Sequence, residues 1–240
     1  MIKVRGEQLT RASLAKHIDF SILHPDTTTA HILEGIEVCK RDLYNSFCVN
    51  PNYLSLVAEG LKGVDVAPSV VLDFPFGSGT PAVKKAAAAD MIERGAEALD
   101  LVIDVGALKD GNYDLVTTEI KDVVALAGPA IKTKIIIEAA LLTDDEIVAA
   151  AKCVTDAGAT YIKSSTGRHG GPSLRTVKLM RDSVPESVGV KVAGTGAFWT
   201  SSIALGCLLA GADLIGTRSG PAILDDLPLL EQIYAPANLG

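Results

Sequence analysis

The feature that most constrains the fold of this chain is a regular alternation of β-prone apolar runs with segments of helical character. The apolar runs lie at residues 17–23, 45–50, 67–74, 98–104 and 134–138, within 158–167 and 188–196, and at 212–216. Alternation of this kind predicts a parallel sheet. Eight such units in about 220 residues fit a closed (β/α)8 barrel, the TIM barrel, better than an open sheet.

Helical segments fill the spaces between these runs. We expect helices at 30–41, 81–94, 113–127, 200–210 and 222–234, one more opened by the capping box at Thr143, and a short N-terminal helix at 7–16. We therefore expect an α/β fold in which residues 1–240 form one barrel domain. An open doubly wound sheet is the alternative, but Gly194-Thr-Gly196 lacks the third glycine and the acidic partner of a dinucleotide fingerprint.

Composition narrows the possible functions. The chain is 48% hydrophobic and only 5% aromatic, which suits buried parallel strands covered by alanine-rich helices. A formal net charge of −7 argues against binding to nucleic acids or anionic membranes. The four cysteines are scattered and no secretion signal or long apolar run is present, so we expect a cytoplasmic protein with reduced thiols.

Two lysines stand near the ends of the sixth and seventh apolar runs. Each of the two, Lys163 and Lys191, is followed by a turn rich in Gly, Ser or Thr, and their separation of 191 − 163 = 28 residues is about one βαβ unit of roughly 30 residues. On neighbouring parallel strands the two ammonium groups would meet at one edge, where each disfavours the charged form of the other. A lysine with a lowered pKa can attack a carbonyl group and form a Schiff base. The alternative is a pair of solvated surface charges.

Polar residues at the ends of the other runs would share the same mouth of a barrel. They are Asp19, Ser21, Cys48, Asn50, Asp73, Asp100, Asp104, Glu138 and Ser165. Because side chains alternate along a strand, we expect Asp100 and Asp104 to share one face, and Lys163 and Ser165 to share another. A carboxylate beside a lysine amine can transfer the protons that imine chemistry requires; the alternative is a ring of structural carboxylates that neutralise the lysines. We expect Lys84 and Lys85 to lie on a solvated helix face and the scattered histidines to form no metal site.

Three glycine-rich or hydroxyl-rich segments follow the last three runs and predict an anion site. They contain Ser165, Thr166, Gly167 and Arg168 in the first, Gly194 and Thr195 in the second, and Gly216, Arg218 and Ser219 in the third. Barrels commonly hold phosphate between such loops, with backbone N–H groups and arginine as donors. Ordinary turn chemistry uses the same residue types and is the alternative.

The motifs as a whole resemble the deoxyribose-phosphate aldolases, which are class I (Schiff-base) aldolases with a (β/α)8 fold. The resemblance runs from Ile18 to about Ile223, and its most specific part is Gly158-Ala-Thr-Tyr-Ile-Lys-Ser-Ser-Thr-Gly167. It also rests on Cys48-Val-Asn-Pro51, Phe74-Pro-Phe-Gly77, Gly95-Ala-Glu-Ala-Leu-Asp100 and Lys134-Ile-Ile-Ile-Glu138.

The resemblance implies cleavage of 2-deoxy-D-ribose 5-phosphate to acetaldehyde and D-glyceraldehyde 3-phosphate. It implies that Lys163 forms the Schiff base, that Lys191 lowers its pKa, and that Asp100 transfers protons. Gly167, Gly194 and Ser219 would bind the phosphate. It further implies a cytoplasmic homo-oligomer, a dimer or a tetramer, that uses no metal and no organic cofactor.

Several positions depart from the family pattern, mostly at the phosphate end. Family members often carry His at Phe20, Lys at His24, Asn at Asp104 and Thr at Ser164, and a longer loop with the sequence Gly194-Thr-Gly-Ala-Phe-Trp199 replaces their usual turn. Arg218 stands where serine is usual. Two alternatives therefore stay open, namely a Schiff-base aldolase for another sugar phosphate or aldehyde, and a phosphate-ligand barrel without lyase activity.

Overall fold

The computed structural model describes residues 2–194 and 198–234. Eight parallel strands close into a barrel in the order β10-β3-β4-β5-β6-β7-β8-β9. They are β3 (Ile18–Ile22), β4 (Ser46–Val49), β5 (Ala67–Leu72), β6 (Ala98–Val102), β7 (Lys132–Ile136), β8 (Tyr161–Lys163), β9 (Gly189–Ala193) and β10 (Leu214–Thr217). The closed parallel barrel predicted from the alternation is thus confirmed.

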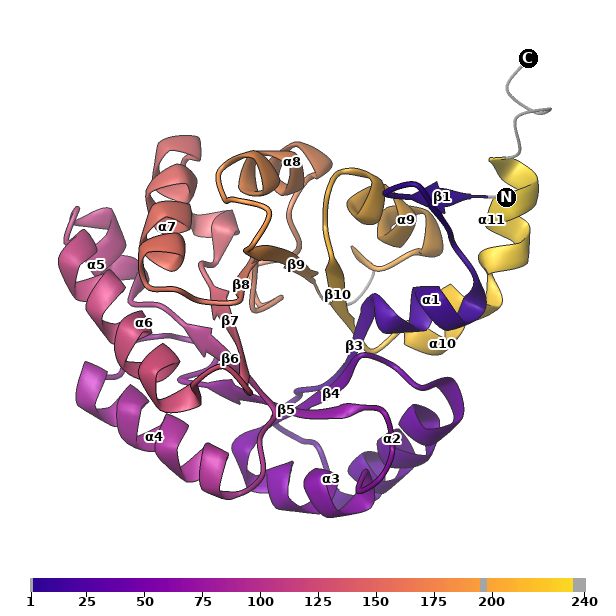
Figure 1. Ribbon diagram of the computed structural model, residues 1–240, viewed down its shortest axis with the longest axis horizontal. Coiled ribbons are helices and arrows are strands. Elements are labelled where there is room, and N and C mark those ends of the chain that lie inside the picture. The colour runs from indigo at the N-terminus through magenta and orange to yellow at the C-terminus, as the bar shows by residue number, and fades with distance from the viewer. Residues whose placement is uncertain (1, 195–197, 235–240) are drawn as a thin grey trace.

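Helices surround the strands as an outer ring (Figure 1). They are α1 (Arg11–Lys16), α2 (Thr29–Asp42), α3 (Leu54–Gly60), α4 (Pro81–Glu93), α5 (Val105–Lys109), α6 (Tyr113–Ala127), α7 (Asp144–Asp156), α8 (Leu174–Asp182), α9 (Ser201–Leu209), α10 (Gly220–Asp225) and α11 (Leu227–Ile233), with 3-10 turns at Pro51–Tyr53 and Ala139–Leu141. Among the described residues, no helix is both long and apolar enough to cross a membrane.

The two ends of the chain differ from the expected elements. The expected helix at 7–16 begins only at Arg11, because Glu7–Gln8 instead pairs as strand β2 with β1 (Lys3–Val4). The expected helix at 222–234 is divided into α10 and α11 at Asp226. Pro228 lies in the first turn of α11, where its missing N–H group costs no hydrogen bond.

Hydroxyl side chains fix the start of five helices at the mouth of the barrel. Thr28, Thr80, Thr143, Ser173 and Thr200 each accept a hydrogen bond from the backbone N–H three residues later. Such caps satisfy N–H groups that have no partner within the helix. The loops that connect strands to helices at this end are therefore held at both ends.

Alternate residues of the strands belong to two different environments. Leu99 and Leu101 of β6 are fully buried in the apolar core that the strands share with the helices, whereas Asp100 between them contacts lysines of other strands. The same alternation holds in β9, where Val190 and Val192 flank Lys191. The main apolar core therefore lies between the strands and the helices, and the interior of the barrel holds the charged side chains together with apolar ones such as Val102 and Ile136.

Candidate active site

Five charged side chains lie buried inside the barrel, and we call Asp19, Asp100, Lys134, Lys163 and Lys191 the charge cluster. Each is at most 3% exposed. Lys163 and Lys191 are register partners on β8 and β9, and Asp100 and Lys134 are register partners on β6 and β7. The predicted neighbourhood of the two lysines therefore follows directly from the pairing of their strands.

Asp100 links the two lysines. Its Oδ2 atom accepts hydrogen bonds from Lys163 Nζ and from Lys191 Nζ, both at 2.7 Å. Ser69 Oγ donates to the other oxygen of Asp100 at 3.3 Å. The predicted grouping of these three residues is therefore present, and one carboxylate oxygen lies between both amines.

Asp19 holds the deeper part of the charge cluster. Its Oδ2 atom lies 2.6 Å from Lys134 Nζ and 2.6 Å from Lys191 Nζ, and its Oδ1 atom accepts from Asn45 Nδ2 at 2.7 Å. Lys191 thus contacts two carboxylates, whereas Lys163 contacts only Asp100 among the described residues. Within the charge cluster three ammonium groups face two carboxylates, so one lysine is left less compensated than the others.

Burial and the neighbouring charges single out Lys163 as that lysine. Burial lowers the pKa of Lys163, the charge of Lys191 lowers it further, and the single contact with Asp100 opposes both without cancelling them. For Lys191, burial also acts to lower the pKa, but Asp100 and Asp19 together raise it above the ordinary lysine range. Lys191 therefore stays protonated, and it lies beside Lys163, whose amine loses its proton more readily.

The carboxylates of the charge cluster stay ionised. Burial acts to raise the pKa of Asp100, but the three lysines outweigh it and hold that pKa well below its usual value. The same balance, with Lys134 and Lys191, holds the pKa of Asp19 far below its usual value. Both groups are therefore available at neutral pH as proton acceptors or as counter-ions.

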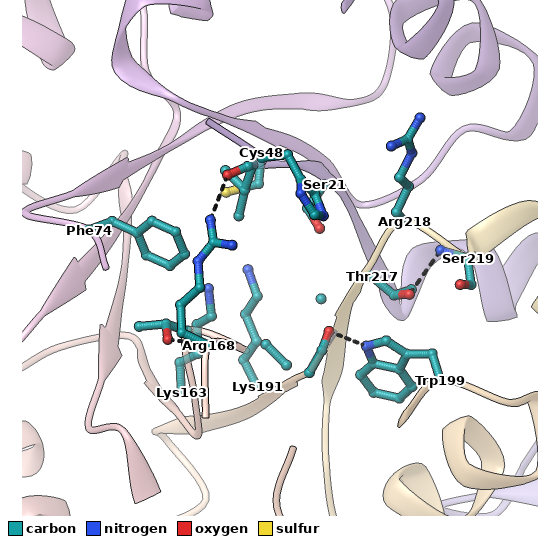
Figure 2. Close-up of a pocket in the computed structure, with 16 residues that line it drawn as sticks. Ser21, Cys48, Phe74, Lys163, Arg168, Lys191, Trp199, Thr217, Arg218 and Ser219 are labelled. Atoms are coloured by element: carbon teal, nitrogen blue, oxygen red, sulfur yellow. Dashed lines mark hydrogen bonds between the residues drawn. The ribbon is translucent and has the colours of Figure 1, made fainter. Parts of the chain in front are cut away.

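A cavity of about 280 Å³ opens above the charge cluster at the carboxyl ends of the strands. Lys163 and Lys191 line its floor, and Figure 2 shows the side chains of both lysines pointing toward the same space. Its walls are formed by Ser21, Leu23, His24, Cys48, Phe74, Thr166, Arg168, Ala193, Gly194, Trp199, Gly216, Thr217, Arg218 and Ser219. A small phosphorylated sugar needs a pocket of this kind, with apolar walls and a few polar groups.

Two arginines stand on the wall of this cavity, Arg168 beside Phe74 and Arg218 near Ser219 (Figure 2). Arg168 donates to the carbonyl oxygen of Leu23 at 3.1 Å, and its guanidinium carbon lies 5.8 Å from the centre of the Phe74 ring. Arg218 is exposed at the rim, and the N–H of Ser219 donates to Thr217 Oγ1 at 2.9 Å. These groups make the wall of the cavity suitable for an anion.

Not every residue predicted to lie at the mouth, in the anion site or as a substrate contact reaches the cavity. Asp19 lies below the lysines, Ser165 is fully buried with its hydroxyl donating to Ser164 Oγ, and Gly167 is absent from the described lining. Ser21, Cys48, Thr166, Gly194, Gly216, Arg218 and Ser219 do line it. Thr195 lies outside the described residues. The thiol of Cys48 is kept neutral, because burial and then Asp100 raise its pKa.

The expectation that Asp104 shares a strand face with Asp100, and that Ser165 shares one with Lys163, was wrong in both cases for one physical reason. Strand β8 ends at Lys163 and β6 ends at Val102, so the alternation of side chains does not extend to Ser165 or Asp104. Thr166 rather than Ser165 lines the cavity, with its hydroxyl bonded to the buried carboxylate of Glu138. Asp104 instead caps α5 by accepting from the N–H of Ala107 at 2.9 Å.

Three residues of structural weight were missed or misjudged from the sequence. Lys134, which the sequence presents only within the motif Lys134-Ile-Ile-Ile-Glu138, is a member of the charge cluster; a lysine within a buried parallel strand signals an internal charge partner. Trp199, which donates from Nε1 to the carbonyl oxygen of Gly194 at 2.9 Å, forms part of the cavity wall. Lys84 was expected in solvent, but it is fully buried and bonded to Glu119.

Comparison with known proteins agrees with the class that the fold and the site define, a barrel enzyme that makes or breaks carbon–carbon bonds through a buried amine. The model of the DeoC/LacD family aldolases matches residues 12–198. The chain belongs to this family of aldolases.

Individual relatives cover nearly the whole chain. A deoxyribose-phosphate aldolase of Streptococcus suis (strain 98HAH33) is 46% identical over 213 residues, which are 88% of this chain and 96% of the relative. A deoxyribose-phosphate aldolase of Geobacillus sp. (strain WCH70) is 44% identical over 89% of this chain and 95% of the relative. The solved deoxyribose phosphate aldolase of Aeropyrum pernix, described as a unique tetrameric structure, superposes with a TM-score of 0.84 at 27% identity, covering 92% of this chain and 93% of that one.

Proposed function

We propose that the protein is a class I aldolase that reversibly cleaves 2-deoxy-D-ribose 5-phosphate to acetaldehyde and D-glyceraldehyde 3-phosphate through a Schiff base on Lys163. The observation that carries the proposal is the position of Lys163. Its amine is buried, contacts one carboxylate, has a lowered pKa and lies on the floor of the cavity. The relatives named deoxyribose-phosphate aldolase support the choice of substrate.

The first half of the reaction uses the neutral amine. Lys163 Nζ attacks the C1 aldehyde of the open-chain sugar, and the carbinolamine loses water to give a protonated imine. Asp100, whose carboxylate lies 2.7 Å from Lys163 Nζ in the free protein, stabilises the positive charge of that imine. Lys191 keeps its proton throughout, because two carboxylates hold it charged.

The second half breaks the carbon–carbon bond. The C3 hydroxyl loses its proton, the C2–C3 bonding electrons move into the imine to form an enamine, and C3 becomes the aldehyde of glyceraldehyde 3-phosphate. Protonation of the enamine at C2 and hydrolysis then release acetaldehyde and the free lysine. Asp100 is ionised and stands beside the imine nitrogen, so we assign it the transfer of these protons, directly or through water.

The phosphate group belongs at the rim of the cavity where Gly194, Gly216 and Ser219 lie, because backbone N–H groups can approach its oxygens there and Arg218 supplies charge. Arg168 supplies a second positive charge from the wall beside Phe74 (Figure 2). The cavity of about 280 Å³ suits a five-carbon sugar phosphate. We propose these residues as phosphate contacts on that basis.

Borohydride trapping tests the proposal. We expect that substrate plus borohydride adds a stable mass to the tryptic peptide that contains Lys163, and that Lys163→Leu abolishes both the adduct and the release of acetaldehyde while the fold survives. Retained turnover in this variant would refute the Schiff-base assignment. Acetaldehyde release measured over a panel of sugar phosphates then distinguishes this substrate from other aldehyde donors.

We also propose that residues 1–240 act as one barrel domain in a cytoplasmic homo-oligomer, a dimer or a tetramer. The tetrameric structure described for the Aeropyrum pernix relative supports an assembly of this kind. Light scattering of the purified protein measures the assembly directly, and a monomeric mass would contradict it.

A further inference from the structure

A second buried ion pair lies outside the barrel, between α4 and α6. Lys84 Nζ donates to Glu119 Oε2 at 2.7 Å, and these side chains are 0% and 1% exposed. The neighbouring Lys85 is instead half-exposed and lies 3.4 Å from Asp122. A buried ion pair seldom maximises stability, because removing two charges from water offsets most of their attraction. The position of this pair therefore calls for a role beyond stability.

Each member of the pair reaches a different loop at the mouth of the barrel. Lys84 Nζ lies 3.7 Å from Asp73 Oδ2, at the end of β5, and Glu119 Oε1 accepts from the N–H of Asp104 at 2.8 Å, just after β6. The pair thus connects the loop that follows β5 to the loop that follows β6.

The loop after β5, residues 73–80, depends on Asp73 for its shape. Asp73 has a positive φ of 49°, its side chain accepts from the N–H of Gly79 at 2.8 Å, and its carbonyl oxygen accepts from the N–H of Gly77 at 2.8 Å. A non-glycine residue at such a φ persists only when its surroundings hold it there. Lys84 supplies a cation beside the carboxylate on which this loop is organised.

The residue that follows Asp73 forms a wall of the substrate cavity. Phe74 lines the cavity, and the guanidinium group of Arg168 lies over its ring (Figure 2). A displaced Asp73 would move Phe74 and, with it, the support of Arg168. Phe74 and Arg168 line the same cavity as Lys163, but among the described residues neither Asp73 nor Phe74 contacts the charge cluster.

We propose that Lys84 and Glu119 are positioning residues for substrate binding, which act by fixing the loop at residues 73–80 and so the wall formed by Phe74 and Arg168. They touch neither the amine nor the carboxylates of the charge cluster. Their loss should therefore weaken binding of the sugar phosphate and leave the reactivity of Lys163 unchanged. The inference rests on the proposed function only for the choice of the sugar phosphate as the kinetic probe.

Lys84→Met and Lys85→Met form a matched pair of variants, since each removes one lysine from the same turn of α4. For Lys84→Met we expect KM for 2-deoxy-D-ribose 5-phosphate to rise about tenfold, or about 1.4 kcal/mol, with kcat within about twofold. Trapping of acetaldehyde on Lys163 by borohydride should keep its wild-type rate, because the partners of Lys84 and Glu119 lie outside the charge cluster. Lys85→Met should change none of these quantities.

A double variant separates positioning from plain stabilisation. Lys84→Met/Glu119→Gln removes both buried charges, while the amide oxygen of glutamine still accepts from the N–H of Asp104. We expect it to recover the melting temperature lost in Lys84→Met but to keep the raised KM. If KM recovers together with the melting temperature, or never rises in Lys84→Met, the inference is overturned.

Hydrogen exchange measures the loop without any substrate. The amides of Gly77 and Gly79 should exchange at least about tenfold faster in Lys84→Met than in Lys85→Met, because both amides donate to Asp73. Unchanged exchange at residues 73–80 overturns the inference even if the protein cleaves another substrate. Failure of the wild-type protein to release acetaldehyde overturns the proposed function instead.

Discussion

At the scale of single residues, the chemistry depends on an unequal sharing of two carboxylates among three lysines. Lys191 bonds to Asp19 and Asp100, whereas Lys163 bonds to Asp100 alone among the described residues. Burial disfavours the charged form of both Lys163 and Lys191, so Lys163, which has fewer contacts, loses its proton more readily. The identity of the nucleophile is thus set by its partners, since all three side chains are chemically the same.

Replacing Lys191 tests this sharing. The free amine of Lys163 is the nucleophile, so the rate falls on the acid side as Lys163 becomes protonated. The charge of Lys191 lowers the pKa of Lys163. We therefore expect Lys191→Met to raise that pKa, to move the acid limb of the kcat/KM profile to higher pH, and to reduce the rate at pH 7 about tenfold, or about 1.4 kcal/mol.

The control for this prediction is Lys152→Met, which removes a lysine that is 75% exposed and paired with Asp156 on α7. Its profile should coincide with that of the wild type. An acid limb that stays in place in Lys191→Met would show that the two amines are not coupled.

At the scale of elements, the ends of the strands decide which side chains reach the cavity. Strand parity correctly separates Asp100 from Leu99 and Leu101, because all three lie within β6. It does not hold for Ser165 or Asp104, because backbone hydrogen bonding to the neighbouring strand has ended before them. Regular alternation is a property of extended backbone, so it predicts faces only within the strand itself.

The loop after β5 shows how closely two elements approach at the mouth. Gly77 has a φ of +68°, and a Cβ atom placed on it would lie 2.1 Å from the carbonyl oxygen of Ile103. Gly111 has a similar φ of +74° and nothing within 4 Å of such an atom. The two glycines therefore differ in contact and not in backbone conformation.

This difference gives a prediction for stability. Gly111→Ala should cost about 1 kcal/mol in free energy of unfolding, from the unfavourable φ alone. Gly77→Ala should cost about 3 kcal/mol, because the methyl group also displaces the loop after β6. Urea unfolding of both variants measures the costs, and equal values would contradict the close approach of the two loops.

At the scale of the whole molecule, closure of the barrel assembles the charge cluster. Asp19 and Lys134 are 115 residues apart in sequence, yet their side chains lie 2.6 Å apart across the interior. Only a closed barrel brings β3 opposite β7 with both side chains pointing inward. The cluster is therefore a product of topology as well as of composition.

Removing the Asp19 carboxylate should leave an excess of positive charge inside the barrel. We expect Asp19→Asn to lower the free energy of unfolding at pH 7 by roughly 3–5 kcal/mol, because it leaves buried ammonium groups without their partner. Asp19→Asn/Lys134→Met should recover part of that loss, and urea unfolding measures both. If the loss in the double variant equals the sum of the losses in Asp19→Asn and in Lys134→Met alone, the pair is not coupled.

The pH dependence of this loss has a defined sign. The pKa of Asp19 is held far below its usual value in the folded state, so its contribution is fully present above the unfolded pKa of about 3.9. It declines as the pH falls from there through the folded pKa. The stability difference between wild type and Asp19→Asn should therefore be constant between about pH 5 and 7 and should shrink in acid.

The sequence by itself determined the barrel, the order of its strands and the nearness of Lys163 to Lys191. These features follow from local periodicity and from the length of one βαβ unit, both of which can be counted along the chain. In helix α4, by contrast, periodicity along the sequence does not show which residues face inward. Its run Ala86-Ala-Ala-Ala89 covers the helix surface with small residues, so no apolar stripe indicates that Lys84 faces inward and Lys85 outward.

Only the tertiary structure decided which lysine is the less compensated one, and that Lys134 and Asp19 complete the charge cluster. It also decided that Lys84 belongs to a buried pair beneath the loop that carries Phe74. The physical reason is that protonation and burial depend on distances between residues far apart in sequence. Those distances are fixed when the barrel closes and the helices pack around it, and no periodicity along the chain encodes them.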